Sequence, residues 1–543
     1  MKSCYLCRKQ LRVMKKYFFV LSAILLMAGT ASAQVINTTS GRISGTEQEG
    51  TMAFLGIPYA KVERFMPPKP VDKWDGVRVC DHWGPQAMQQ TWGRTLNEDE
   101  MSENCCVLNV WTTDEGLRAS APHPSTLKPV MVWLHGGGFD SGTSAWDPGM
   151  QLAKKDVVVV SVNHRLNILG FLDLSAVSEK YRYSGNAGML DVVQALEWVR
   201  DNINNFGGDP QNVTIFGESG GGGKVGTLMC MPAAKGLFHK AIIMSGTILN
   251  VNTHEMTQSL GKAVLKELGI SETEVERIKD VPYQELYAAG QRAMAASIGT
   301  RKPGTPMMWG FGPTPDGESL FQQPFQPGFS ALSAGKPLMI GTTFNELQRL
   351  HYDRDITLDE ARTELVKTFG DETDAYITAF AKAYPDYTPQ DLLSIDWLFR
   401  PKTIITADAI TSSTDLLPSP SSLHPSPVYM YMFTWRSPLN NGSIHGHELK
   451  FCFNTLQNAK NDLPHPTDED LRLADTMSSV WAQFAKTGNP QIASLPAWHP
   501  YTAENGELMV FGPRCYIRNN PDRELEAIIN RHCFKQLDEF NAR

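Results

Sequence analysis

The hydrophobic positions of this chain form nearly unbroken apolar runs, separated by stretches with helical spacing. Runs of about four to eight apolar residues are typical of strands that are buried on both faces. They occur at residues 130–134, 156–163, 213–216, 240–244, 337–341 and 428–433. Between the second and third runs, apolar residues from Met189 to Ile203 recur at the spacing of one helix face. This alternation predicts an α/β fold, with a mostly parallel central sheet and helices on both faces.

Two longer segments carry helical spacing only. The first spans about residues 252–335, and Leu260, Val264 and Leu268 lie on one helix face within it. The second spans about residues 355–425. Because sheet strands resume after each segment, we expect both to be helical insertions that roof the sheet. Residues 34–543 are therefore predicted to form one domain.

The first 33 residues have the pattern of a secretory signal peptide. Lys15 and Lys16 precede an apolar stretch from Tyr17 to Met27, and Ala31-Ser32-Ala33 supplies a small-residue cleavage site. Met14 is an alternative start. No later segment resembles a membrane span, so we expect a secreted or periplasmic protein after the signal is removed.

The charge of the chain limits its possible partners, and its cysteine content predicts free thiols. The chain carries a net charge of −8, and the leader holds six basic groups, so the remainder is at about −14 (−8 less 6). This acidic balance argues against a nucleic-acid partner. Two of the nine cysteines lie in the leader. The remaining seven leave at least one free thiol, and most are expected to pack as core residues.

The run 213–216 ends in a motif that carries chemistry. Gly217-Glu218-Ser219-Gly220-Gly221 matches G-x-S-x-G, a strand-to-helix turn that exposes a nucleophilic serine. The run 130–134 ends in His135-Gly136-Gly137-Gly138-Phe139. Consecutive glycines after a buried strand let backbone N–H groups converge on an oxyanion. Each motif is weak alone, but the two in this order are much more specific.

A serine nucleophile needs a base and an acid, which come after it in the order acid, then histidine. Glu346 follows the run 337–341 and is the best acid, with Asp316 as its rival. His445 and His447 follow the run 428–433 and compete for the role of base. Such a site requires no metal and no cofactor.

With these motifs the chain resembles the type-B carboxylesterase/lipase family, which is related to cholinesterases. The matching segments are 135–139, 185–188, 206–210, 217–219, 445–446 and 484–490. The resemblance implies a single α/β-hydrolase catalytic domain whose insertions roof the active site. It implies a catalytic triad of Ser219, Glu346 and His445. It further implies oxyanion donors at Gly137, Gly138 and Gly220, with Glu218 and Ser245 as supporting residues.

Several positions depart from the family pattern. Gly220 stands where alanine is usual, and the glycine run that it begins weakens the first helical turn. Leu347 replaces the glycine that usually follows the acid. The family's early disulfide would join Cys105 to the position of Ala87, which leaves Cys80 or Cys106 as substitute partners.

The predicted function is the hydrolysis of small to medium carboxylic esters through a covalent acyl-enzyme. Two alternatives remain open. One is a non-catalytic, cholinesterase-like binding protein, and the other is an amidase that uses the same site.

Overall fold

The computed structural model describes most of the chain after the leader. The described residues are 34–90, 100–113, 117, 127–299, 310–325, 330–347, 355–412, 426–439, 442–458, 463 and 465–533. The predicted signal peptide lies outside this part of the chain, as does most of the stretch 413–427. Among the described helices, none is both long and apolar enough to cross a membrane.

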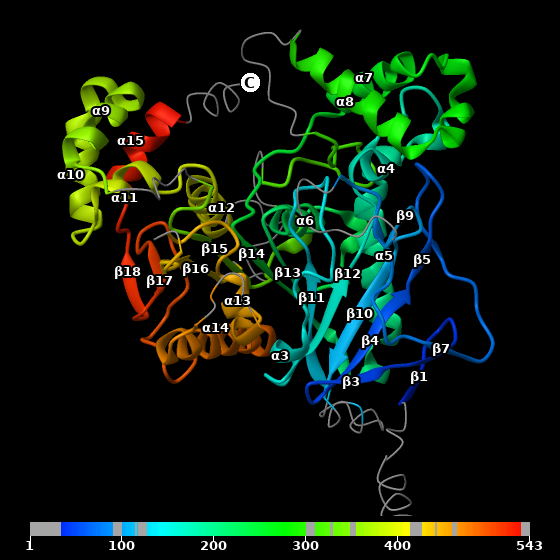
Figure 1. Cartoon of the computed structure of the whole chain (residues 1–543), viewed down its shortest axis with the longest axis horizontal. Helices are drawn as coiled ribbons and strands as arrows, with labels where there is room; N and C mark the ends of the chain where they lie inside the picture. The colour runs from blue at the N-terminus through cyan, green and yellow to red at the C-terminus, as the bar shows by residue number, and fades with distance from the viewer. Residues whose placement is uncertain are drawn as a thin grey trace, which may run out of the picture.

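An 11-stranded sheet forms the centre of the molecule, in the order β18-β17-β16-β15-β14-β13-β11-β12-β10-β4-β3 (Figure 1). Its strands are β3 (Thr46–Gln48), β4 (Thr51–Pro58), β10 (Val107–Thr112), β11 (Lys128–Leu134), β12 (Val158–Val162), β13 (Gly208–Glu218), β14 (Lys240–Met244), β15 (Leu338–Thr343), β16 (Val428–Phe433), β17 (Glu507–Phe511) and β18 (Tyr516–Asn519). Smaller sheets join β1 (Val35–Asn37), β2 (Arg42–Ser44) and β7 (Val77–Val79), β5 (Ala60–Lys61) with β6 (Lys69–Pro70), and β8 (Gln86–Ala87) with β9 (Met101–Ser102).

The middle of the large sheet is parallel and its two margins are antiparallel. Strands from β12 to β17 pair in parallel, whereas β10, β4 and β3 pair antiparallel at one margin and β18 does so at the other. The apolar runs of the sequence lie in this parallel region, as expected for strands covered on both faces. The prediction of an α/β fold is confirmed.

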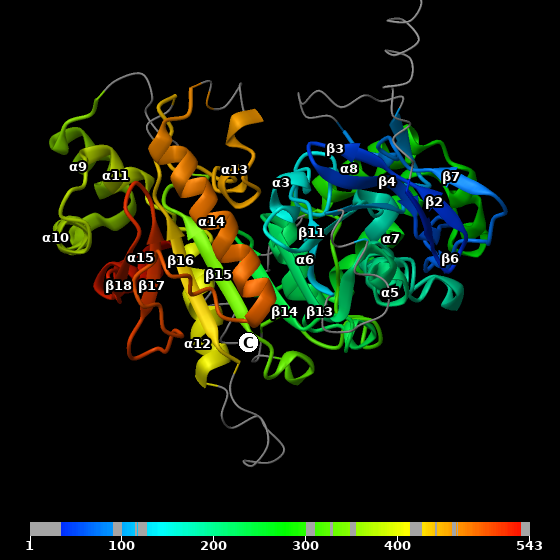
Figure 2. The same cartoon turned by 90° about the horizontal axis from the view of Figure 1, so that it is seen from below.

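Alternate side chains of each strand enter two separate cores. On β11, Val132 packs into one core and Trp133 packs into the other. The first core is covered by α5 (Ala187–Asn202), α6 (Gly220–Leu228) and α12 (Arg400–Ser412), and the second by α3 (Met150–Ala153), α13 (Leu449–Cys452) and α14 (Asp468–Thr487). Figure 2 shows α14 running along the middle strands. The two layers of helices remove the sheet from water on both sides.

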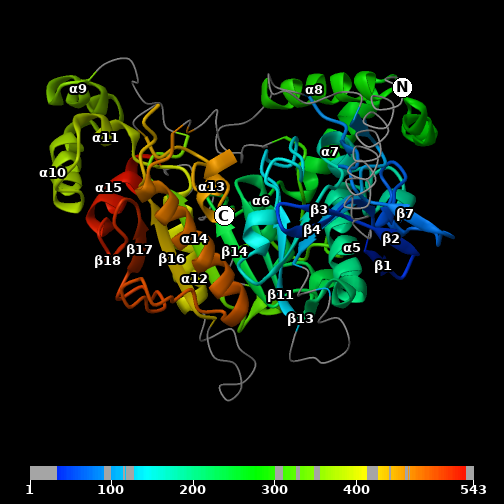
Figure 3. The same cartoon turned by 60° about the horizontal axis from the view of Figure 1, so that its bottom comes forward.

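Most of the remaining α-helices form two groups, apart from the short α4 (Asn167–Phe171) and the C-terminal α15 (Arg523–Cys533). One holds α7 (His254–Glu267), η7 (Glu272–Asp280) and α8 (Tyr283–Gly299). The other holds α9 (Leu358–Phe369), α10 (Thr373–Ala383) and α11 (Pro389–Ser394). Figures 1 and 3 show α7 and α8 at one end of the molecule and α9 and α10 at the opposite end. The C-terminal helix α15 packs against α10 and α9.

Candidate active site

Five neighbouring parallel strands end at the same edge of the sheet and carry the predicted site residues. The neighbours are β16, β15, β14, β13 and β11. Register places Leu134 beside Gly217, and Glu218 beside Met244. The residues that come after these strand ends are therefore adjacent in space although they are far apart in sequence.

The turn after β13 holds Ser219 in a strained backbone conformation. Ser219 has φ 55° and ψ −124°, a region that residues with a side chain rarely adopt. Its N–H donates to the carbonyl oxygen of Met244 at 2.9 Å, which fixes the turn to the end of β14. A Cβ atom on Gly221 would lie 2.0 Å from the carbonyl oxygen of Leu134, so the turn packs too tightly for a side chain there. The serine that the motif singled out is thus raised above the sheet edge.

The glycine loop after β11 lies against this turn. Gly137 and Gly138 have φ of 87° and 65°, which glycine adopts without strain. A Cβ atom on Gly220 would lie 2.4 Å from the backbone nitrogen of Gly138, so the three predicted oxyanion donors are close together. The N–H groups of Gly137 and Gly138 donate to no acceptor in the described part of the chain. They remain available to a ligand.

Glu346 and His445 meet at the ends of β15 and β16. Nδ1 of His445 lies 2.5 Å from Oε2 of Glu346, and the backbone N–H of His445 donates to the carbonyl oxygen of Glu346 at 3.1 Å. Oε1 of Glu346 accepts a hydrogen bond of 2.7 Å from the N–H of Thr343. Glu346 is 1% exposed. The carboxylate is therefore fixed in position and shielded from water.

The other ring nitrogen of His445 faces a second carboxylate. Nε2 lies 3.3 Å from Oε1 of Glu218, and the described structure contains no hydrogen bond between His445 and Ser219. The ring also stacks on Phe399, with centroids 5.1 Å apart and planes 8° apart. Burial alone would lower the pKa of His445, but the charges of Glu218 and Glu346 outweigh it and raise that pKa to about 10. The site favours an imidazolium.

The rival acid lies elsewhere. Asp316 accepts hydrogen bonds from the backbone N–H groups of Ser319 at 2.7 Å and Leu320 at 3.0 Å, and from the Asn186 amide at 3.0 Å. Burial tends to raise the pKa of Asp316, but these hydrogen bonds lower it overall. Asp316 therefore stabilises the turn that contains Ser319 and Leu320, and the structure does not bring it to either candidate histidine.

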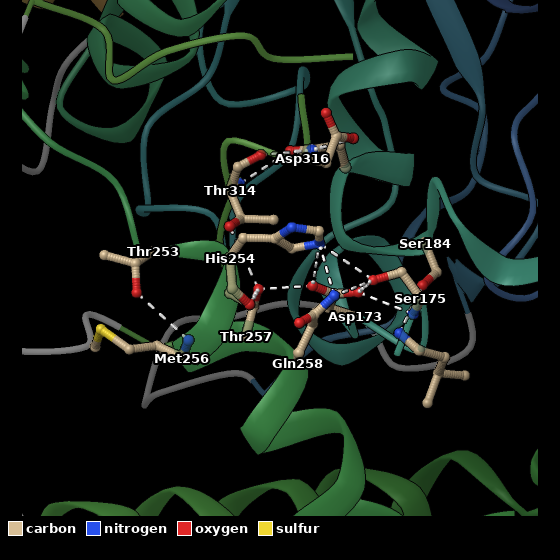
Figure 4. Close-up of polar contacts among 12 residues, drawn as sticks. Asp173, Ser175, Ser184, Thr253, His254, Met256, Thr257, Gln258, Thr314 and Asp316 are labelled. Atoms are coloured by element: carbon tan, nitrogen blue, oxygen red, sulfur yellow. Dashed lines mark hydrogen bonds and ion pairs between the residues drawn. The ribbon is translucent and has the colours of Figure 1, made fainter. Parts of the chain in front are cut away.

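Figure 4 shows Asp316 beside a group of polar residues that resembles a triad in composition only. Nε2 of His254 lies 3.3 Å from Oδ2 of Asp173 and 3.1 Å from Oγ of Ser175. A catalytic acid and serine contact opposite ring nitrogens, but here both contact the same one. This group instead ties the start of α7 to the body of the molecule.

The rival base also points elsewhere. The ring of His447 packs edge-on against Trp435, with centroids 6.1 Å apart. Of the two histidines, His445 alone contacts Glu346.

A third buried glutamate completes the surroundings of His445, and sequence reasoning missed it. Glu448 is 0% exposed, and its Oε1 accepts a hydrogen bond of 3.2 Å from Oγ of Ser245. Burial, together with the charges of Glu218 and Glu346, raises the pKa of Glu448 well above its usual value. The charge of Glu448 in turn acts with those of Glu218 and Glu346 to raise the pKa of His445. The only sequence signal was its place three residues after His445.

The structure corrects the expected disulfide substitution. Cys80, Cys105 and Cys106 are all buried with free thiols. Cys105 packs with Ala87, the residue at the family's partner position, so the missing bond is replaced by an apolar contact. Neither Cys80 nor Cys106 substitutes. The expectation that most cysteines are core residues is confirmed for the described ones.

The chain is similar to known proteins over nearly its whole length. A family model described as the Carboxylesterase family matches residues 32–524. The Para-nitrobenzyl esterase of Bacillus subtilis (strain 168) is 34% identical over 517 residues, which cover 90% of this chain and 97% of that protein. The Fumonisin B1 esterase of Sphingopyxis macrogoltabida is 31% identical over 517 residues, which cover 90% of this chain and 89% of that protein. A solved structure, an esterase from anaerobic Clostridium hathewayi that can hydrolyze aliphatic aromatic polyesters, matches with a TM-score of 0.81 at 34% identity and covers 92% of this chain and 99% of that one.

Proposed function

The chain belongs to the carboxylesterase family and is a type-B ester hydrolase, and on this premise we propose that Ser219, His445 and Glu346 carry out the reaction. The observation that carries this proposal is the contact between His445 and Glu346 beside the strained Ser219 turn. The ring of His445 contacts both the buried carboxylate of Glu346 and Glu218, the residue directly before Ser219.

In the first step His445 takes the proton of Ser219 while the hydroxyl oxygen attacks the ester carbonyl carbon. Nε2 must turn from Glu218 toward Ser219 when substrate arrives, since catalytic hydrogen bonds often tighten only in the substrate complex. Glu346 holds Nδ1 and stabilises the positive charge that develops on the ring.

The carbonyl oxygen becomes negatively charged in this step. The N–H groups of Gly137, Gly138 and Gly220 would stabilise that charge, and removal of one such donor costs about 3–4 kcal/mol in comparable sites. The N-terminus of α6 adds a favourable partial positive charge at the same point.

Collapse of the tetrahedral intermediate breaks the bond to the alcohol oxygen, which takes the proton from His445. The acyl group stays on Ser219. Water then attacks the acyl carbon, His445 accepts the water proton, and the carboxylic acid leaves as Ser219 regains its hydrogen. Atoms balance with water as the only second reactant.

The experiment that tests the proposal is the replacement Ser219→Ala. We expect the rate of hydrolysis of a short-chain p-nitrophenyl ester to fall by at least about 1,000-fold with the fold retained. In the wild type, a phosphonate ester should add one group to the peptide that contains Ser219, as seen by mass spectrometry. Turnover retained by the folded Ser219→Ala variant would remove Ser219 from the mechanism.

The substrate class is proposed to be small to medium esters. The Bacillus subtilis relative is named for a para-nitrobenzyl ester, which supports an ester of this size. A panel of p-nitrophenyl esters with increasing acyl length measures the preferred size, and a matched anilide tests the amidase alternative. A rate on the anilide equal to that on the ester would contradict the assignment.

We also propose that residues 1–33 direct export. The basic, apolar and small-residue segments of the leader support this proposal. A fusion of residues 1–33 to a reporter enzyme that is active only outside the cytoplasm tests it, with Leu25→Arg as the matched control. Equal activity of the two fusions would contradict export.

A further inference from the structure

A buried lysine lies directly behind the glycine loop. Lys224 is in the second turn of α6 and is 0% exposed. Its Nζ donates to the carbonyl oxygen of His135 at 2.9 Å and to that of Gly138 at 2.9 Å. These two carbonyls flank the peptide units of Gly137 and Gly138. One side chain therefore bridges both ends of the turn that presents the predicted oxyanion donors.

We propose that Lys224 is a positioning residue for the oxyanion hole, which holds the His135–Gly138 turn against the Ser219 turn so that its N–H groups point at the reacting oxygen. This inference rests on the proposed function. Lys224 touches neither substrate nor reacting atoms, and it acts through the backbone of the loop.

The loop has other hydrogen bonds. At its near end they lie within the loop itself, where the carbonyl oxygen of Gly137 accepts from the N–H of Ser141 at 3.0 Å and that of Gly136 lies 2.8 Å from Nδ1 of His135. The bonds to residues outside the loop, apart from those of Lys224, hold its far end. The backbone N–H of Asn167 donates to the carbonyl oxygen of Phe139 at 2.8 Å, and the Gln89 side chain bonds to both backbone groups of Gly142, at 2.7 and 2.9 Å. Loss of Lys224 would leave these contacts in place. We therefore expect the loop to stay folded while its near end, with Gly137 and Gly138, loses its fixed position.

The close packing at Gly220 points to the same arrangement. A Cβ atom on Gly220 would lie 2.1 Å from the carbonyl oxygen of Gly138, the atom that Lys224 binds. A lysine that bonds to this carbonyl and a glycine that leaves room for it therefore act at the same point of the loop.

The two histidine rings near Lys224 carry no charge that would repel its ammonium group. His135 and His164 stack with centroids 5.2 Å apart, and burial followed by the charge of Lys224 lowers the pKa of His135 to about 3 and that of His164 well below its usual value. Both rings therefore stay neutral. Arg165 lies near His164, and Glu218 is the carboxylate that faces Lys224.

Burial lowers the pKa of Lys224 to about 7, against the opposing charge of Glu218. An ammonium has three N–H donors and a neutral amine has two. Both hydrogen bonds to the loop are thus kept on either side of this pKa.

The test compares Lys224→Met with wild type and with Lys240→Met. Lys240 is the matched control because it is also buried, but it bonds to Asn212 at the opposite end of β14 from Met244. For Lys224→Met we expect kcat on a p-nitrophenyl ester to fall by about tenfold or more with KM within about twofold. Complete removal of one oxyanion donor costs about 100- to 1,000-fold, and a displaced donor should cost less. Affinity for a trifluoromethyl ketone, whose serine adduct carries an oxyanion, should fall by a similar factor.

Unchanged kcat and ketone affinity in folded Lys224→Met would overturn the proposal, and so would an equal loss in Lys240→Met. If Lys224→Met does not fold, Lys224→Gln decides, because its side chain stays polar but ends one atom short of the Lys224 Nζ and cannot bridge both carbonyl oxygens. The same split between kcat and KM is expected there, and wild-type kinetics would overturn the proposal. Failure of the proposed function is a separate result, since the wild type itself would then not turn over the ester.

Discussion

Nε2 of His445 lies 3.3 Å from Oε1 of Glu218, the residue directly before Ser219, while Nδ1 of the same ring contacts Glu346. The imidazole therefore lies between two carboxylates. This arrangement stabilises the imidazolium that forms when a serine is deprotonated, but it also favours protonation of the base before the reaction starts. The pH dependence of the enzyme should report the balance between these two effects.

Glu218→Gln should shift the acid limb of the kcat/KM profile to lower pH. The raised pKa of His445 means that the neutral base is fully present only above that pKa, and removal of the Glu218 charge lowers it. The measurement is kcat/KM from about pH 5 to 10 for wild type and variant. An acid limb that stays in place, or that moves to higher pH, would show that Glu218 does not hold the proton on His445.

Gly220→Ala should lower kcat by about tenfold or more with little change in KM, because the new methyl group displaces Gly138 and its N–H. The matched control is Gly223→Ala in the same helix, where a Cβ meets Ile248 at an ordinary 3.4 Å. That variant should keep its activity and gain up to about 1 kcal/mol of stability from helix propensity. Equal kinetics for the two variants would contradict the close approach of the two turns.

The loss in Gly220→Ala should be smaller in a Lys224→Met background. Without the lysine the loop is free to move away from the methyl group, so the two effects on kcat are expected to be less than additive. A double-mutant cycle on kcat measures this coupling. Strict additivity would mean that Lys224 does not draw Gly138 toward Gly220.

Paired variants decide the acid and the base. Glu346→Gln and His445→Ala should each lower kcat by at least about 1,000-fold. The second variant lacks the general base, and the first lacks the carboxylate that orients the base and stabilises its positive charge. Asp316→Asn and His447→Ala should retain kcat within about threefold, since neither side chain contacts Glu346, His445 or Ser219. A large loss of kcat in a folded rival variant would reassign the role.

The buried thiols should be unreactive in the native protein. Burial raises the pKa of Cys80 to about 11 and that of Cys106 well above its usual value, so almost no thiolate is present at neutral pH. Iodoacetamide should label Cys80, Cys105 and Cys106 only after denaturation, and a reducing agent should leave the melting temperature unchanged. A disulfide-linked peptide that contains any of the three would contradict the free thiols.

Sequence patterns predicted the parallel strands and the residues at their ends, because a strand buried on both faces needs an apolar run and a motif identifies the turn at its end. His445 and His447 lie in the same loop, two residues apart, and only His445 contacts Glu346. The spacing of apolar residues in the sequence cannot distinguish between two positions in one loop. Glu448 and Lys224 were missed because their roles arise from contacts between segments far apart in the chain.

Gly220 is a residue that the sequence analysis singled out, but for a different physical reason from the one that the structure shows. Its departure from the family's alanine indicated a weaker helix start, which is a local effect on propensity. The structure gives a tertiary reason instead, since the backbone of Gly138 occupies the space that a side chain would need. The residue is set by the neighbouring loop, and propensity could not reveal that.

The proposed catalytic groups follow four strands, β11, β13, β15 and β16, which are distributed over more than half of the chain. No short fragment contains them all, so hydrolysis can appear only after the whole sheet has assembled. Recovery of activity after denaturation should therefore lag behind recovery of the helical circular dichroism signal. Esterase activity would then measure the final step of folding, the assembly of the sheet.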